Sequence, residues 1–114
     1  LNVQYADTPV THNMTQAQFN EAATVAAASM LLLLRSGLTL MHCSSGDRAS
    51  AVFAVALIAT GNATNVEAEA FAIRYLLLAD PGIKTFVLQY QTPSWFGDLW
   101  RAGGLGGGEI LAVR

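Results

Sequence analysis

Apolar and polar positions alternate along the chain in blocks that predict helices first. Thr15 with Gln18 three residues later forms a capping box, which predicts that a helix begins there. The apolar stretch that follows continues to about Arg35. Gly37 comes next and is a natural stop, because glycine adopts the left-handed conformation at low cost.

A second apolar block starts at Arg48 and is apolar nearly all round to Ile58. A helix that is apolar on every side is buried on every side, so we expect a core helix here, closed by Gly61. Thr64 with Glu67 is a second capping box and predicts a helix that runs to about Ala79.

The last third of the chain divides into one more helix and a glycine-rich tail. Asp80 followed by Pro81 predicts a helix start, because proline is tolerated in the first turn, and this helix should end before Pro93. Residues 94–114 hold two tryptophans and six glycines without periodicity. We therefore expect a domain over residues 1–93 and an irregular Gly-rich tail over 94–114.

Two short segments predict strands: Asn-Val-Gln-Tyr at residues 2–5 and Leu-Thr-Leu-Met at residues 38–41. The order strand, helix, strand, loop, helix implies a parallel pair with a right-handed crossover. The fold class expected is α/β, a parallel sheet flanked by helices. The chain begins with Leu1 and not with methionine, so we expect this fold to be incomplete at the N-terminus.

Composition narrows the class of protein. The 114 residues suffice for one domain and are 53% hydrophobic and 12% charged, with a net charge of -2. Six basic residues are spread over the chain, which argues against nucleic-acid binding. There is no cationic-then-apolar leader, and the densest apolar stretch, residues 22–34, is too short to span a bilayer. We expect a cytoplasmic protein without a membrane partner.

The candidate catalytic and binding residues lie in one segment between the second predicted strand and the core helix, His42-Cys43-Ser44-Ser45-Gly46-Asp47-Arg48. Successive backbone N–H groups there can surround an anion, and the helix N-terminus adds its positive end. Gly46 permits the backbone angles of such a nest, and Arg48 offers a planar fork for two oxygens. Next to these N–H groups, the helix N-terminus and Arg48, the thiol of Cys43 should be ionised to a thiolate and act as a nucleophile.

Other interpretations of these residues stay open. Cys43, the single cysteine, could be a buried inert thiol. His42 could ligate zinc with His12, although a histidine that braces the loop is favoured and no metal is expected. Asp47 could be a solvent-facing residue at the helix start or a proton donor.

The motif His-Cys-x-x-Gly-x-Arg between strand and helix resembles the signature loop of the cysteine-dependent phosphatases, the protein tyrosine and dual-specificity superfamily. Four residues separate Cys43 from Arg48, where the common form has five. That spacing resembles the small bacterial phosphatase-like domain of beta-lactamase-hydrolase-like proteins, and also many rhodanese loops. Two flanks favour the phosphatases: residues 5–19, and the helix start at residues 61–70.

The resemblance covers about residues 2–80 and implies a phosphatase-like parallel sheet and a cofactor-independent hydrolase. Its substrate would be a phosphoprotein or a small phosphate ester, held by Ser44, Ser45, Gly46, Asp47 and Arg48. Cys43 would be the nucleophile, Asp7 or Asp47 the general acid, and His42 and Ser50 supporting residues. Two alternatives remain: a rhodanese-like sulfurtransferase with a Cys43 persulfide, or a non-catalytic module that binds a small oxyanion. The run Thr11-His12-Asn13, where the family usually has its aspartate, supports the last.

Overall fold

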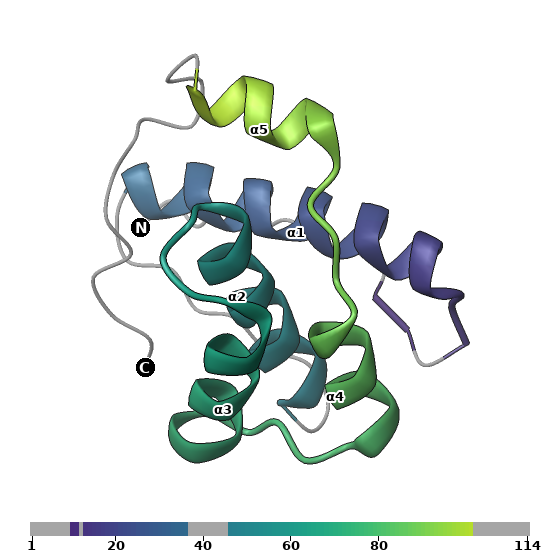
Figure 1. Ribbon diagram of the computed structural model, residues 1–114. Coiled ribbons are helices and arrows are strands. Elements are labelled where there is room, and N and C mark those ends of the chain that lie inside the picture. The colour runs from purple at the N-terminus through teal and green to yellow at the C-terminus, as the bar shows by residue number, and fades with distance from the viewer. Residues whose placement is uncertain (1–9, 12, 37–45, 102–114) are drawn as a thin grey trace.

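Five helices make up the part of the protein that the computed structural model describes, residues 10, 11, 13–36 and 46–101. They are α1 (Gln16–Ser36), α2 (Asp47–Ala59), α3 (Asn65–Tyr75), α4 (Pro81–Leu88) and α5 (Ser94–Arg101). In Figure 1, α1 crosses the molecule, α2 and α3 run side by side beneath it, and α5 lies along α1 on the other side. Helix α4 completes the layer below α1.

The expected α/β fold with its parallel sheet is wrong. Helices take up 74% of the described residues, and none of these residues forms a strand, so the protein is a small helical domain. Helix α2 packs directly on α1, α3 and α4 and not on a sheet. The two segments predicted as strands, residues 2–5 and 38–41, lie outside the described residues. Short apolar runs of this kind cannot be assigned to a strand by periodicity alone, which is why the sequence misled.

Helix α1 begins where its capping box predicts. The Thr15 N–H donates to Gln18 Oε1 over 2.8 Å, and the Gln18 N–H donates to Thr15 Oγ1 over 3.1 Å. Along one face of the helix an apolar stripe is buried at helical spacing: Phe19, Ala23, Ala26, Ala27, Met30 and Leu31. This stripe forms one wall of the core.

Helix α2 forms the centre of the core, as its all-round apolar sequence predicts. Every residue from Ser50 to Ala56 is buried. Alanine is the most frequent residue in both α1 and α2, and its small side chain lets the two helices approach each other closely. The chain then turns at Gly61, whose φ of 78° lies in the left-handed region.

Helix α3 starts with the predicted capping box between Thr64 and Glu67. It ends at Tyr75, four residues before the expected Ala79. The N–H groups of residues 77, 79 and 80 donate to side-chain oxygens of α2 and not to carbonyls one turn earlier. These competing acceptors explain why the helix stops early.

Helix α4 begins at Pro81, as predicted, and ends at Leu88, within the limit that Pro93 set. Asp80 caps it by accepting from the Ile83 N–H over 3.0 Å, and Pro81 occupies the first turn. At the other end, the Asn65 side chain donates to the carbonyls of Val87, Leu88 and Tyr90. One amide thus holds the end of α4 to the start of α3.

Residues 94–101, expected to begin an irregular tail, form the helix α5. Phe96 is fully buried and stacks on Trp100 at a centroid distance of 6.2 Å. The Trp95 Nε1–H donates to Glu21 Oε1 of α1 over 2.8 Å. Trp95, Phe96, Leu99 and Trp100 recur at helical spacing, so this short segment carries a helix signal that its assignment to the tail overlooked. Residues 102–114 lie outside the described part.

By length and composition alone, α1 could cross a membrane, because the stretch Gln16–Arg35 has a mean hydropathy of 1.3. This stretch is longer than residues 22–34, the dense apolar run that the sequence suggested. The core helix of a soluble protein meets the same two criteria, and α1 buries its apolar stripe against the other helices. Within this stretch 39% is buried inside the protein, and Val25 and Leu32 on it remain exposed, so the packing covers only part of its apolar surface.

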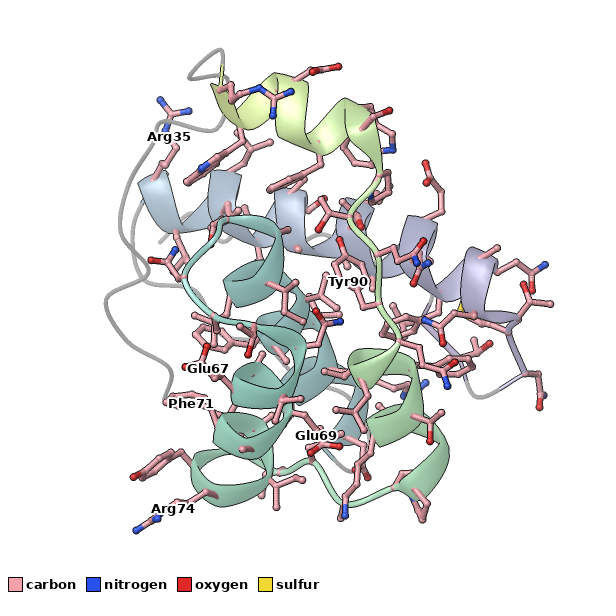
Figure 2. The ribbon with its side chains drawn as sticks, in the orientation of Figure 1. Arg35, Glu67, Glu69, Phe71, Arg74 and Tyr90 are labelled. Atoms are coloured by element: carbon pink, nitrogen blue, oxygen red, sulfur yellow. The ribbon has the colours of Figure 1, made fainter. Side chains whose placement is uncertain are left out.

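Phe19 packs against two other aromatic rings in the core. Its ring stacks on Phe86 at 4.9 Å and meets Tyr90 edge-on at 6.4 Å. The Tyr90 hydroxyl points into the interior, where it shares a hydrogen bond of 2.5 Å with Thr24 Oγ1 (Figure 2). Burial raises the pKa of Tyr90 above its ordinary value of 10.0, so this buried hydroxyl stays protonated.

Candidate functional site

Four of the predicted site residues come together at the N-terminus of α2. Gly46 precedes the helix with φ 87° and ψ −12°, Asp47 and Arg48 stand in its first turn, and Ser50 follows them. This is the loop-to-helix junction that the sequence predicts at the end of the candidate loop. The partial positive charge of the helix N-terminus is therefore located beside Arg48.

The other predicted residues lie outside the described part of the chain: Asp7, His42, Cys43, Ser44 and Ser45. The nucleophile, its neighbours in the loop and one of the two candidate acids therefore remain predictions. The same holds for His12, the second histidine considered for a metal.

Gly46 is required at this junction for two independent reasons. Its φ is one that residues with a side chain rarely adopt. In addition, a Cβ added there would lie 2.4 Å from Leu77 Cδ1 and 2.7 Å from Leu77 Cβ. The segment between α3 and α4 thus passes so close to the candidate loop that only glycine fits.

Asp47 fixes that same segment. Its Oδ1 accepts the Ala79 N–H over 2.6 Å and the Asp80 N–H over 2.8 Å. The side chain is partly buried. The sequence offered two roles for Asp47, a solvent-facing residue or a proton donor. The geometry adds a third, in which the carboxylate binds two backbone donors of another loop.

Ser50 makes a parallel contact one turn further along α2. It is 6% exposed, and its Oγ accepts the Leu77 N–H over 2.9 Å. The sequence predicts Ser50 only as a supporting hydroxyl near the arginine. In the structure it supports the approach of residues 76–80 to the helix.

Arg48 lies between these two anchoring residues in the sequence. The residue is half-buried, and its Nε is shielded from solvent. The Arg48 guanidinium and the N-terminus of α2 are therefore adjacent, and both attract an anion. Within the described residues, no group of three His, Cys, Asp or Glu side chains could hold a metal ion.

The pKa values of Tyr90 and Glu67 are displaced, and both residues stand away from this junction. Tyr90 lies in the aromatic core around Phe19. The pKa of Glu67 is lowered from its ordinary 4.5 because its carboxylate accepts hydrogen bonds from the backbone and hydroxyl of Thr64. The Glu67 shift reflects helix capping and has no bearing on the candidate site (Figure 2).

Sequence reasoning missed the segment of residues 76–80. Its contribution comes from three backbone N–H groups and from the close approach of Leu77 to Gly46. Backbone donors have no residue signature, so no sequence pattern could have identified them. The only signal in the sequence was Asp80-Pro81, which marks where the segment ends.

Comparison of the chain with protein-family models, with curated proteins and with solved structures found no match. Function is therefore inferred from the chemistry of the candidate loop and the geometry of the junction at the start of α2.

Proposed function

We propose that the protein is a cysteine-dependent phosphatase that acts on a phosphoprotein or a small phosphate ester. The observation that supports this most is the junction at Gly46. A left-handed glycine leads directly into the N-terminus of α2, with Arg48 in the first turn. That is the anion-binding half of the predicted motif, and it follows the predicted nucleophile Cys43 by a few residues.

In the proposed reaction the Cys43 thiolate attacks phosphorus in line with the leaving oxygen. A sulfur–phosphorus bond forms, and the phosphorus–oxygen bond to the leaving group breaks. The leaving oxygen takes a proton from the general acid, and water then hydrolyses the phosphocysteine to inorganic phosphate. Arg48 and the amides at the start of α2 hold the non-bridging oxygens, and this electrostatic stabilisation is the largest contribution expected from the protein.

Of the two candidate acids, we favour Asp7. Two backbone N–H groups donate to Asp47 Oδ1, and hydrogen bonds of this kind favour the ionised carboxylate, which has no proton to give. Asp7 is the remaining candidate in the sequence, upstream of the loop.

The test is hydrolysis of an aryl phosphate, with vanadate as competitor. We expect turnover by the wild type, no turnover by Cys43→Ser, and a loss of roughly tenfold or more in Arg48→Lys, because lysine lacks the planar fork. Arg74→Lys is the matched control, since Arg74 is exposed on α3 and projects away from the body of the molecule (Figure 2). If vanadate binds without turnover, the protein is an anion-binding module and not an enzyme.

Sulfur transfer is the second candidate, and the four-residue spacing between Cys43 and Arg48 favours it. Here the thiolate would take the outer sulfur of thiosulfate, release sulfite, and pass that sulfur to an acceptor such as cyanide. A mass spectrum of the protein after exposure to thiosulfate separates the two reactions. An increase by one sulfur atom on Cys43, without vanadate binding, would replace the phosphatase by the sulfurtransferase.

A further inference from the structure

The segment between α3 and α4 is fastened to the first turns of α2 by three hydrogen bonds. Asp47 Oδ1 accepts from the N–H groups of Ala79 and Asp80, and Ser50 Oγ accepts from that of Leu77. All three donors belong to the backbone of residues 76–80, and both acceptors belong to α2. We call these contacts the α2 clamp.

The α2 clamp brackets Arg48. Asp47 precedes the arginine by one residue and Ser50 follows it by two, so both sides of its helical turn are fixed. The first turn of a helix ordinarily frays, because its N–H groups lack partners within the helix. A turn held at two side chains cannot rotate or unwind without breaking these bonds, and the direction in which Arg48 leaves the backbone is fixed with it.

The clamp is itself anchored to the rest of the fold. Asp80, one of its donors, also caps α4 by accepting from the Ile83 N–H over 3.0 Å. Ile83 and Val87 of α4 are fully buried. On the other side, Leu77 lies against Gly46 at the end of the candidate loop. The junction is thus connected to the core through α4.

We propose that Asp47 and Ser50 are positioning residues, which hold Arg48 and the N-terminus of α2 in the geometry that binds the phosphoryl group. The inference deepens the proposed phosphatase function and rests on it where it concerns the substrate. It assigns Asp47 the role of an acceptor that binds the backbone, in place of the proton donor that the sequence allowed.

Two variants of Asp47 separate these roles. Asp47→Asn keeps an oxygen that can accept from Ala79 and Asp80 but removes the acid. Asp47→Ala removes both. The matched control is Asp98→Ala, which removes an exposed carboxylate that pairs with Arg101 on α5.

The first measurement requires no activity: the hydrogen-exchange rates of the Arg48 Nε–H and of the Ala79 and Asp80 amides, followed by NMR. The Arg48 Nε is shielded from solvent, so its proton reports how firmly the arginine is held. We expect faster exchange of all three protons in Asp47→Ala, near wild-type rates in Asp47→Asn, and no change in Asp98→Ala.

The second measurement is kcat/KM for two aryl phosphates, one with a good and one with a poor leaving group. A displaced arginine should cost up to about a hundredfold for both substrates, because misplacement of a binding group by 1 Å has effects of that size. We expect this equal loss in Asp47→Ala and recovery of most activity in Asp47→Asn. A loss confined to the poor leaving group, or Asp47→Asn as inactive as Asp47→Ala, would overturn the assignment in favour of the proton donor.

The two proposals can fail separately. If the wild type hydrolyses no phosphate ester and binds no vanadate, the phosphatase proposal is wrong, while the Arg48 Nε–H rates still decide whether the clamp positions the arginine. Unchanged exchange at Arg48 alongside faster exchange at Ala79 and Asp80 would show that it does not. If Asp47→Ala does not fold, Ser50→Ala carries the same test through the single Leu77 bond.

Discussion

The core around Phe19 and the junction at the start of α2 hold the molecule together by different means. Phe19 is fully buried, stacks on Phe86 and meets Tyr90 edge-on, so its contribution comes from apolar area and close packing. At the junction, hydrogen bonds from a backbone segment reach the partly buried Asp47 and the buried Ser50. Burial is non-directional, whereas these bonds fix particular atoms in space.

The core mainly contributes to the stability of the fold, whereas the junction mainly fixes the position of the helix end. A core of this kind tolerates small changes of shape at modest cost. A junction of directional bonds adds only about 1–3 kcal/mol per bond to stability, the upper end for the two that Asp47 accepts, yet it determines the orientation of the helix end. Mutations in the two regions should therefore affect different observables, and the comparison can be tested on that basis.

The largest effect is expected from Phe19→Ala. Loss of a fully buried ring that contacts Phe86 and Tyr90 should lower the free energy of unfolding by about 3–5 kcal/mol. Urea unfolding followed by circular dichroism measures this. Vanadate binding in the folded fraction should be unchanged, and a weakened affinity there would show that the two regions are not independent.

Gly46→Ala should have the second largest effect on stability. Its effect on function should be larger than that of Phe19→Ala. The left-handed φ and the clash with Leu77 together should cost about 2–4 kcal/mol. Gly61→Ala is the matched control: its φ is also left-handed, at 78°, but no atom lies within 4 Å of the added Cβ. It should cost only about 1–2 kcal/mol. Equal costs in urea unfolding would mean that Leu77 moves aside freely.

Tyr90→Phe tests a directional bond inside the aromatic core, the one between the Tyr90 hydroxyl and Thr24. Loss of the bond to Thr24 should cost about 1 kcal/mol at neutral pH, since Thr24 keeps its bond to the Asn20 carbonyl. Because burial raises the pKa of Tyr90 above 10.0, the unfolded chain ionises first. Wild-type stability should therefore fall as pH rises through and above 10, and the variant should lack that part of the decline.

The smallest effect concerns the exposed capping box of α3, which lies outside both regions. The pKa of Glu67 is lowered from 4.5 by its bonds to Thr64, so the stability it contributes is present above 4.5 and is lost as pH falls through the folded pKa. Glu67→Gln keeps an acceptor for the Thr64 N–H and should show a weaker acid dependence of unfolding. An identical acid dependence in both proteins would contradict the assignment.

Local signals in the sequence predicted the helices well. Both capping boxes, the Asp80-Pro81 start and the all-round burial of α2 depend on residues that are neighbours in the chain, and all of them are confirmed. The prediction of a parallel sheet was wrong. It was inferred from two runs of four residues, which are too short for their periodicity to distinguish a strand from a helix. Helix α5 was not predicted, although Trp95, Phe96, Leu99 and Trp100 recur at helical spacing, because residues 94–114 were interpreted together as one glycine-rich tail.

The candidate site was predictable in part. Gly46 and Arg48 lie at the start of α2, where the sequence placed the end of the candidate loop, and their role in binding an anion beside Cys43 stays a prediction. The role of Asp47 was not predictable, because its partners are backbone N–H groups more than thirty residues away. Such donors exist at every residue other than proline, and only the packing of α4 on α2 selects these two.

Both tryptophans of the chain, Trp95 and Trp100, belong to α5. Intrinsic fluorescence excited at the tryptophan band therefore reports on one short helix, whereas far-ultraviolet circular dichroism reports on all five. An emission change that precedes the loss of ellipticity during unfolding would mean that α5 detaches as a separate unit. Coincident curves would mean that the bond from Trp95 to Glu21 and the buried Phe96 make α5 part of the cooperative core.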